Sequence, residues 1–230
     1  RMAEFPLDPM LSKAVLASET YGCTTEVLTI VGMLSIGGSI FYRPKEKAIH
    51  ADTAKQNFAR GGGGDQVSLL RVYNQWEAAG YSTQWCFENY LQIRALHRAR
   101  DVREQLAGLC ERVELDEVSC NGDINIICKA LCAGYFFNAA KMSRSGDYKT
   151  VKQQHTVYIH PSSCLAKEEE PPKWVLYHEL AFTTKEYMRN VCPMEGAWLT
   201  EIAPHYYQKA DIEEVKKAMP HKKAVGKASA

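Results

Sequence analysis

The chain has 230 residues, of which 46% are hydrophobic and 24% are charged, and its formal net charge is +1. This composition predicts one large or two small globular domains. The near-neutral charge excludes a basic field over the whole chain, so a nucleic-acid partner would have to be met by a local patch. No apolar run reaches the roughly 18 residues that a membrane span needs, and we expect no membrane partner.

The chain contains eight cysteines. None forms a CxxC pair and no secretory signal is present, which favours reduced structural thiols in an intracellular protein. Cys128 and Cys132 lie one helical turn apart, but no neighbouring histidine completes a zinc site. The chain opens at Arg1 and Met2 without an obvious start, and we expect it to be a piece of a longer protein.

Helical signals dominate the first part of the sequence. Pro6 and Pro9 predict an extended entry, and Asp8 is the residue type of an N-cap with Pro9 at the first helical position. Apolar residues then recur at helical spacing, with a flexible break at the glycine run 61–65. The predicted helices begin at Pro9 within residues 1–20 and then span residues 24–35, 50–60, 65–79, 84–113 and 122–141.

The pattern changes after residue 145, where short runs of β character alternate with turn residues. The predicted strands span residues 149–160, 173–183, 186–192 and 197–203, and a Lys- and Ala-rich tail follows at 209–230. We expect the tail to begin as a helix and to end in disorder. The sequence thus predicts an α+β protein: a helical bundle followed by a small barrel, for which the OB-fold, a binder of single-stranded nucleic acid, is the favoured candidate.

No enzyme signature is found in the sequence. The glycine run at 61–65 lacks the GK[ST] ending of a phosphate loop. The stretch YHELAF at 177–182 places Phe182 where a zinc protease needs its second histidine, and no G-x-S-x-G elbow occurs. We therefore expect no catalytic residue, no metal site and no bound cofactor in this chain.

Two arginines on the predicted long helix are candidate RNA contacts. Arg94 and Arg98 lie four residues apart and share one face of that helix. One interpretation is a helix that follows a phosphate backbone. The other is a solvated face with ion pairs such as Arg98–Asp101, worth about 0.2–0.5 kcal/mol each.

The first predicted strand and its flanks carry the second group of candidates. Its apolar residues Val157 and Ile159 alternate with Thr156, Tyr158 and His160, and no acidic residue falls within 149–163. Lysine and arginine can neutralise phosphates, and serine hydroxyls can bond phosphate or ribose. An ordinary exposed strand face is the alternative interpretation. The predicted RNA-binding residues, over both groups, are Arg94, Arg98, Arg144, Lys149, Lys152, His160, Ser162 and Ser163.

Several longer blocks resemble one known family. The stretches RMAEFPLDPMLSKAVLASE, EVLTIVGMLS, FYRP, WCFENYLQIRALHRARDVREQL, TVYIHPSS, WVLYHELAFTTKEYMR and WLTEIAPHYY are similar, in this order, to the C-terminal half of spliceosomal DEAH-box RNA helicases. The resemblance covers about residues 1–207. Within the branch, HAD, GYSTQWC, ARDVREQL, CAGYF and YKTVKQQ look closest to members that act on the activated spliceosome before the first splicing step.

This resemblance implies an architecture and a biological setting. Residues 1–20 would end a winged-helix domain, 21–141 would form a helical ratchet-like domain, 142–207 the OB-fold, and 208–230 a partly disordered tail. The parent would be an ATP-dependent RNA helicase of the nucleus whose RecA-like domains, outside this chain, bind ATP and Mg²⁺. Its implied partners are single-stranded pre-mRNA, a G-patch activator and other spliceosomal proteins. A module that docks proteins and binds little RNA remains the alternative.

Overall fold

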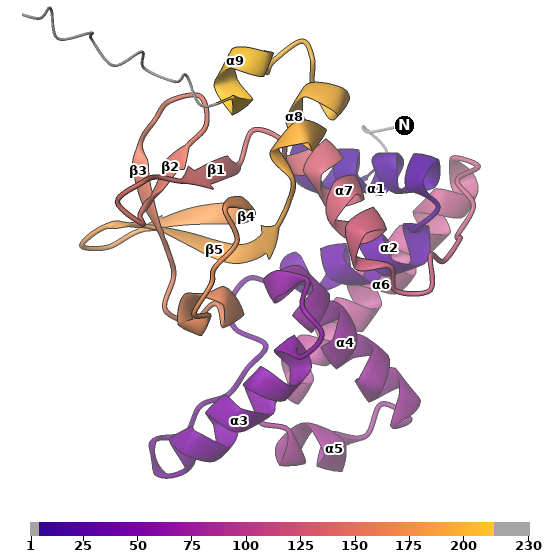
Figure 1. Ribbon diagram of the computed structural model, residues 1–230. Helices are drawn as coiled ribbons and strands as arrows, with labels where there is room; N and C mark the ends of the chain where they lie inside the picture. The colour runs from indigo at the N-terminus through magenta and orange to yellow at the C-terminus, as the bar shows by residue number, and fades with distance from the viewer. Residues whose placement is uncertain (1–4, 214–230) are drawn as a thin grey trace, which may run out of the picture.

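A helical part and a closed β-barrel make up the protein, as the sequence predicts (Figure 1). The computed structural model describes residues 5–213. The helical part comprises α1 (Pro9–Tyr21), α2 (Thr24–Leu34), η2 (Lys45–Lys47), α3 (Ala48–Ala59), α4 (Gly64–Ala78), α5 (Thr83–Glu88), α6 (Ile93–Arg112) and α7 (Ile124–Tyr135). The barrel and its extension comprise β1 (Ala139–Met142), β2 (Tyr148–Thr150), β3 (Thr156–Ile159), η3 (Cys164–Lys167), β4 (Trp174–Phe182), β5 (Glu186–Pro193), α8 (Gly196–Ile202) and α9 (Lys209–Ile212).

Helix α2 lies at the centre of the helical part. It packs against α1, α4, α6 and α7, and Val27, Leu28, Ile30 and Val31 on it are completely buried. Gly32 allows a close approach to α6, because a Cβ there would lie 3.0 Å from the carbonyl oxygen of Ala99. A helix that is apolar on nearly all sides, as this sequence is, must lie inside a bundle.

The predicted N-cap of the first helix is confirmed. The side chain of Asp8 accepts a hydrogen bond from Met10 N at 2.9 Å, and Pro9 occupies the first helical position. At the other end Gly22 adopts the left-handed conformation that commonly closes a helix. These two local signals position α1, which packs mainly on α7.

The predicted long helix at 84–113 is wrong as a single element. It consists of α5 and α6, separated by residues 89–92. Tyr90 has a positive φ of 55°, and Leu91 pairs with Phe41 in an isolated antiparallel bridge. Gln92 N also donates to Ile40 O at 2.8 Å. The chain leaves the helical path here because a distant segment supplies its backbone hydrogen bonds.

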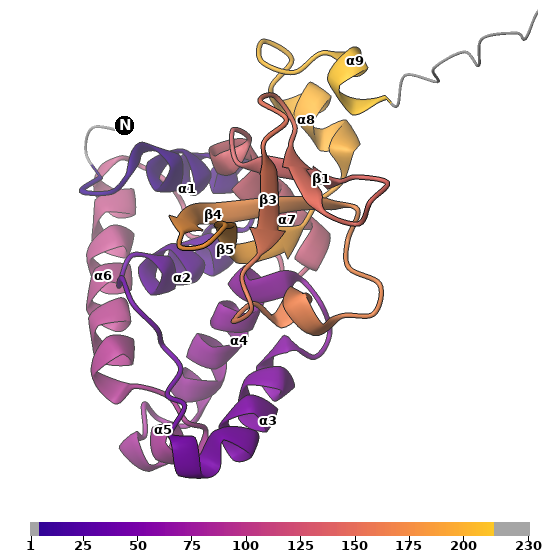
Figure 2. The same cartoon turned by 90° about the vertical axis from the view of Figure 1, so that its left-hand side faces the viewer.

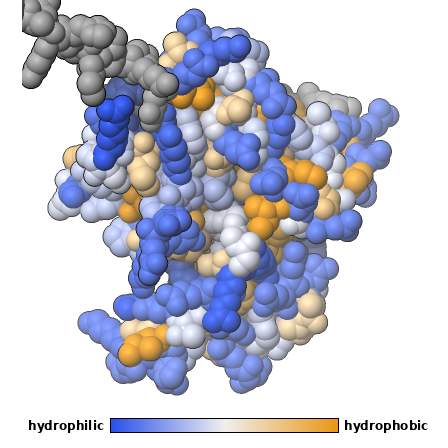
Figure 3. Space-filling view, in the orientation of Figure 1, coloured by the Kyte–Doolittle hydropathy of each residue, from blue (hydrophilic) through white to orange (hydrophobic). Residues whose placement is uncertain are grey.

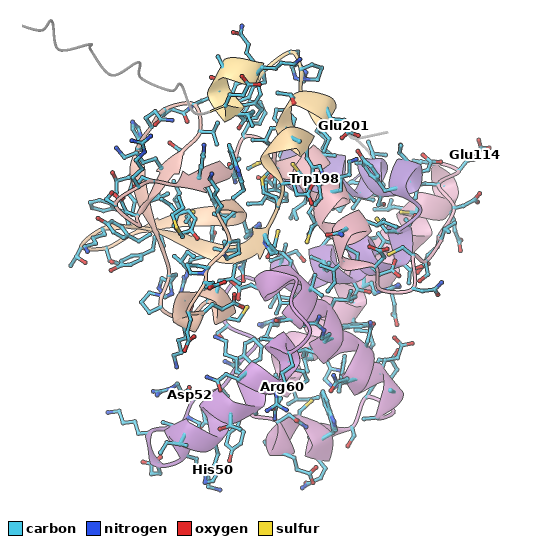
Figure 4. The ribbon with its side chains drawn as sticks, in the orientation of Figure 1. His50, Asp52, Arg60, Glu114, Trp198 and Glu201 are labelled. Atoms are coloured by element: carbon cyan, nitrogen blue, oxygen red, sulfur yellow. The ribbon has the colours of Figure 1, made fainter. Side chains whose placement is uncertain are left out.

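Two further elements differ from the prediction. The helix expected to reach residue 141 ends at Tyr135, and Ala139–Met142 form β1, which pairs with both β2 and β4. The strand expected at 197–203 is the helix α8. Figure 4 shows Trp198 and Glu201 on α8 beside α7, and Lys129 of α7 donates to Glu201 at 2.7 Å. Short apolar runs fit either a helix or a strand, and packing decides between them.

The barrel closes in the strand order β1-β2-β3-β5-β4. All neighbouring pairs are antiparallel except β3 and β5, which run parallel. The predicted strand at 149–160 is split into β2 and β3 by a turn, whereas the strands expected at 173–183 and 186–192 are confirmed as β4 and β5. The buried barrel core is formed by Ala140, Tyr148, Val157, Leu165, Val175, Tyr177, Met188 and Val191.

The start of α4 docks directly on the barrel. A Cβ on Gly64 would lie 2.7 Å from Cys192 Cα and still closer to the carbonyl oxygen of Val191, so only glycine fits against β5. The next residue, Asp65, is buried and bonds to barrel segments. Gln66 Nε2 donates to Asn190 O at 2.5 Å. The glycine run predicted as a flexible break is therefore the place where the two parts of the protein join.

The eight cysteines are free, and most of them are buried. The predicted helical start of the tail is confirmed by α9 at Lys209–Ile212, whereas the disorder expected beyond it lies outside the described residues. Within residues 5–213, no helix combines the length and the apolar character needed to cross a membrane.

Candidate nucleic-acid interface

An aromatic face lies on the outside of the barrel where β3 and β5 run side by side. It consists of Tyr158, His160, Lys185 and Tyr187. Tyr158 and Tyr187 are register partners with ring centroids 6.3 Å apart, and His160 lies 5.5 Å from Tyr187. Lys185 Nζ lies over the Tyr158 ring at 4.3 Å from its centroid. Tyr158 and Tyr187 point outward because Val157 and Met188, their neighbours in sequence, point into the barrel core.

Half-buried rings beside a lysine suit a single nucleic-acid strand. Bases stack on aromatic side chains whatever their sequence, and cations neutralise the backbone phosphates between them. Figure 3 shows mainly hydrophilic residues over β1, β2 and β3, so this part of the barrel surface faces water. The arrangement can hold a nucleotide chain without reading its sequence.

A hollow of about 360 Å³ opens at the end of β3, between the helical part and the barrel. Figure 2 looks onto the side of the molecule where the segment after α2, the end of β3 and the start of α4 come together. We call this cavity between the helical part and the barrel the interdomain hollow. Its polar lining residues are Gly37, Gly38, Ser39, Lys55, Asp65, Ser68, Ser162, Ser163, His178, Glu179, Arg189 and Asn190.

Two cations from different parts of the protein line the interdomain hollow. Lys55 of α3 donates to the carbonyl oxygen of Ser162 at 2.5 Å and lies 4.9 Å from the centre of the Phe41 ring. Burial lowers the pKa of the Lys55 ammonium below its usual value. Arg189 of β5 is exposed and makes no side-chain hydrogen bond or ion pair to any residue between 5 and 213.

Asp65 also borders the hollow, but its oxygens are already bonded. Asp65 Oδ2 accepts from Ser163 Oγ at 2.5 Å and from Val191 N at 2.8 Å, and Oδ1 accepts from Cys164 N at 2.9 Å. This buried carboxylate holds the segment after β3 and the strand β5 in fixed positions relative to α4. It acts as a connector between the two parts, with little capacity left for a ligand.

His160 connects the aromatic face to the interdomain hollow. Its Nδ1 accepts a hydrogen bond from Ser162 N at 3.1 Å and lies 2.7 Å from Ser162 Oγ. Burial lowers the pKa of His160, and the positive charges of Arg189 and Lys55 lower it further. The ring is therefore neutral near pH 7, with its proton on Nε2.

Comparison with known protein families agrees with this geometry. Residues 8–69 match the family described as helicase associated domain (HA2), ratchet-like. Residues 127–206 match the oligonucleotide/oligosaccharide-binding (OB)-fold family. These two domains together make up the C-terminal module of DEAH/RHA helicases. The ratchet-like match covers α1 to α3 and the beginning of α4, and the closed barrel lies within the OB-fold match.

The module places the predicted residues at the end of β3 in different roles. His160 belongs to the aromatic face, and Ser162 lines the interdomain hollow. Ser163 is buried, and its hydroxyl both donates to Asp65 and accepts from Leu165 N at 3.2 Å. A direct bond from the Ser163 hydroxyl to RNA would therefore compete with the contacts that anchor this segment.

The predicted basic residues of the β1–β2 region also differ in their surroundings. Lys149 is the register partner of Thr156, next to the aromatic face, and Arg144 is exposed in the turn between β1 and β2. Lys152 instead donates to Asp211 at 3.0 Å, and its Nζ lies 5.3 Å from the centre of the Tyr206 ring. Lys152 thus ties α9 to the barrel.

Arg94 and Arg98 lie on exposed positions of α6. The main packing partners of α6 are α2 and α5, and both views show α6 well separated from β2 and β3 (Figures 1 and 2). The module therefore does not bring these arginines together with the barrel lysines on one surface. Whether they contact RNA stays a prediction.

Sequence reasoning missed Lys55, Lys185, Tyr187 and Arg189. The alternation of Tyr187 and Arg189 about Met188 within a predicted strand was the available signal for two of them. No sequence signal joins Lys55 to Ser162, because 107 residues separate them and only the tertiary fold, in which α3 packs on α4, brings them into contact.

Proposed function

We propose that this module guides single-stranded RNA backbone during translocation by a pre-mRNA-splicing ATP-dependent RNA helicase. The observation that carries the proposal is the continuity of the aromatic face with the interdomain hollow through His160 and Ser162. Stacking rings followed by cations form a path suited to a nucleotide chain. The helicase family of the two matched domains supports a motor as the rest of the parent protein.

The finer assignments in this proposal rest on the sequence blocks similar to the spliceosomal branch. They place the parent in the nucleus, on pre-mRNA, before the first splicing step. In that setting ATP and Mg²⁺ act in RecA-like domains outside this chain, and a G-patch activator and other spliceosomal proteins are its partners. The module itself contributes binding and guidance, and its residues carry out no bond-breaking step.

Binding of fluorescein-labelled oligouridine to the 230-residue chain tests the proposal. Tyr187→Ala removes a stacking ring, and because base–aromatic stacking is worth about 1–3 kcal/mol, we expect affinity to fall at least about fivefold. Lys149→Glu reverses a charge beside the aromatic face, and we expect weaker binding with a shallower salt dependence. Lys45→Glu, with the same charge change on η2, is the matched control and should bind as the unaltered chain does.

Equal binding by all three variants would contradict RNA guidance by this face. Circular dichroism of each variant should match the unaltered chain, so that lost binding reports on contacts and not on unfolding. In the full-length helicase, Tyr187→Ala should also reduce RNA-stimulated ATP hydrolysis while leaving the basal rate unchanged.

A second candidate function is the docking of splicing factors or helicase activators. The β4–β5 hairpin favours it, because Phe182 is 77% exposed and Leu180 is 42% exposed there. Exposed apolar side chains of this size often mark protein contacts. This function predicts that Phe182→Ser impairs splicing by the full-length protein without changing oligouridine binding, and that Tyr187→Ala leaves both unchanged.

A further inference from the structure

Arg189 and Glu179 face each other across β4 and β5 at the edge of the interdomain hollow. They are register partners in the antiparallel pair, and both side chains line the hollow. Opposite charges at such positions commonly bond to each other. Within residues 5–213, however, neither side chain makes a hydrogen bond or an ion pair. One free cation and one free carboxylate therefore stand side by side at a single cavity.

Lys55 provides a second cation to the lining of the interdomain hollow. One of its N–H groups bonds to the carbonyl oxygen of Ser162, and an ammonium has three donors, so two remain for a ligand. Lys55 contacts Ser162, and His160 N of the same segment donates to Met188 O, next to Arg189 on β5. The two cations, one from α3 and one from β5, thus converge on the same end of the hollow.

Backbone donors complete the wall formed by the segment after α2. Gly37 and Gly38 have positive φ values of 61° and 92°, and a Cβ at either position would meet nothing within 4 Å. Their N–H groups make no hydrogen bond to another residue of the described range 5–213. Free N–H groups in a left-handed segment are typical of anion-binding concavities.

The remaining carboxylate, Asp65, offers no free oxygen to a ligand, although its charge still acts on Lys55. Its two oxygens already accept three hydrogen bonds from the barrel. The chemistry left open to a ligand is therefore a phosphate-binding end, made by Lys55, Arg189 and backbone donors, and one hydrogen-bond acceptor, Glu179. The volume of about 360 Å³ falls within the range of about 300–1,000 Å³ of small-ligand sites.

We propose that the interdomain hollow holds one ribonucleotide of the bound strand. Arg189 and Lys55 bind its phosphate, and the Glu179 carboxylate accepts a hydrogen bond from the ribose 2′-hydroxyl. A deoxynucleotide lacks that donor, so Glu179 makes the site prefer RNA to DNA. This inference rests on the proposed function, because the aromatic face next to the hollow delivers the strand.

Paired titrations with oligouridine and oligodeoxyuridine of equal length test the inference, since the two probes differ only in the 2′-hydroxyl. For the unaltered chain we expect tighter binding of the RNA probe. Glu179→Ala should weaken RNA binding and leave DNA binding unchanged or stronger, so that the ratio of the two affinities approaches one. Glu111→Ala, on the exposed side of α6, is the matched control and should leave this ratio unchanged.

Arg189→Gln should lower the binding affinity for both probes by about tenfold, because both carry the phosphate. The ratio of the RNA affinity to the DNA affinity should stay unchanged. The salt slope, d log K/d log[salt], should become shallower by about 0.7, as expected for one lost phosphate contact on a single strand. Arg112→Gln at the far end of α6 is the matched control. Arg189 is exposed, so we expect this variant to fold normally.

Three results would overturn the inference. They are equal binding of both probes by the unaltered chain, an unchanged affinity ratio in Glu179→Ala, and unchanged affinity in Arg189→Gln. If Tyr187→Ala still weakens binding in any of these cases, the aromatic face keeps its role and only the nucleotide site is rejected. If Tyr187→Ala also binds normally, the proposed function fails as well.

Discussion

The carboxylate of Asp65 accepts a hydrogen bond from the hydroxyl of Ser163 at 2.5 Å, and 98 residues of chain separate the two. Asp65 belongs to the first turn of a ratchet helix, and Ser163 belongs to the barrel segment beside the interdomain hollow. Together with the bonds from Cys164 N and Val191 N, this contact makes the Asp65 side chain one of the links that fix the relative position of the two domains.

Asp65→Ala tests this dependence. The substitution leaves three donors without their acceptor, at a cost of about 1–3 kcal/mol for each one that stays buried. We expect the free energy of unfolding, measured by urea denaturation, to fall by at least about 3 kcal/mol. The control Asp101→Ala removes an exposed carboxylate from α6 and should change the free energy of unfolding by less than about 0.5 kcal/mol. A similarly small change in Asp65→Ala would contradict the role of this connector.

Gly64→Ala should also destabilise the contact between the two domains, because the new methyl group would clash with β5. Gly64 has a φ of 74°, and a Cβ there would collide with the backbone of Val191 and Cys192 on β5. Gly80 has a comparable φ of 68° but open space around it. We expect Gly80→Ala to cost about 1 kcal/mol, the usual price of a left-handed alanine, and Gly64→Ala to cost clearly more. Thermal unfolding of the two variants makes the comparison, and equal melting temperatures would show that β5 moves aside freely.

The contact between Tyr135 and His178 should make stability depend on pH. Tyr135 Oη lies 2.8 Å from His178 Nδ1, and burial lowers the pKa of His178 below its usual 6.5. Between the lowered folded value and about 6.5, the unfolded chain binds more protons. The contribution of neutral His178 to the free energy of unfolding is therefore complete above about pH 6.5 and declines as the pH falls from there towards the folded pKa.

His178→Gln removes this titration and should flatten the change in unfolding free energy between pH 7 and pH 5. His160, whose pKa burial also lowers, contributes a remaining slope in the same direction. His205→Gln, at an exposed position, serves as the control and should preserve the original profile. An unaltered slope in His178→Gln would show that this histidine is not the source.

Lys152 and Lys149 should differ in what they do, although they lie close in sequence. Lys152→Ala breaks the contact with Asp211, and we expect faster amide hydrogen exchange in α9 with less than about 1 kcal/mol lost from global stability. Oligouridine binding should stay within twofold, in contrast to Lys149→Glu. A strong loss of RNA binding in Lys152→Ala would show that Lys152 also contributes to the RNA-binding surface.

The same contact predicts an acid response of α9. The pKa of Asp211 lies below its usual value, first because Gln208 N donates to the carboxylate and then because Lys152 does. The stabilisation is present above the unfolded pKa, near 3.9, and is lost as the pH falls through the lowered folded value. The protection factors of the α9 amides, which correct for the intrinsic pH dependence of exchange, should therefore be preserved at pH 5 and fall only well below pH 4.

Signals that act within a few residues were readable from the sequence alone. Asp8 followed by Pro9 fixes the start of α1 because both effects need only the first turn of the helix. The run of β character at 186–192, set off by turn residues, predicted β5. The composition of these segments determined the α+β class and the order of helices and barrel.

What depends on distant partners was decided only by the tertiary structure. The break between α5 and α6 exists because Ile40 O accepts from Gln92 N and Tyr42 N donates to Tyr90 O. The split of β2 from β3 follows from closure of the barrel. The interdomain hollow combines Lys55, Ser162 and Arg189 from three separate elements. Residue spacing carries no information on such long-range contacts, because the free energy that creates them comes from packing the helical core against the barrel.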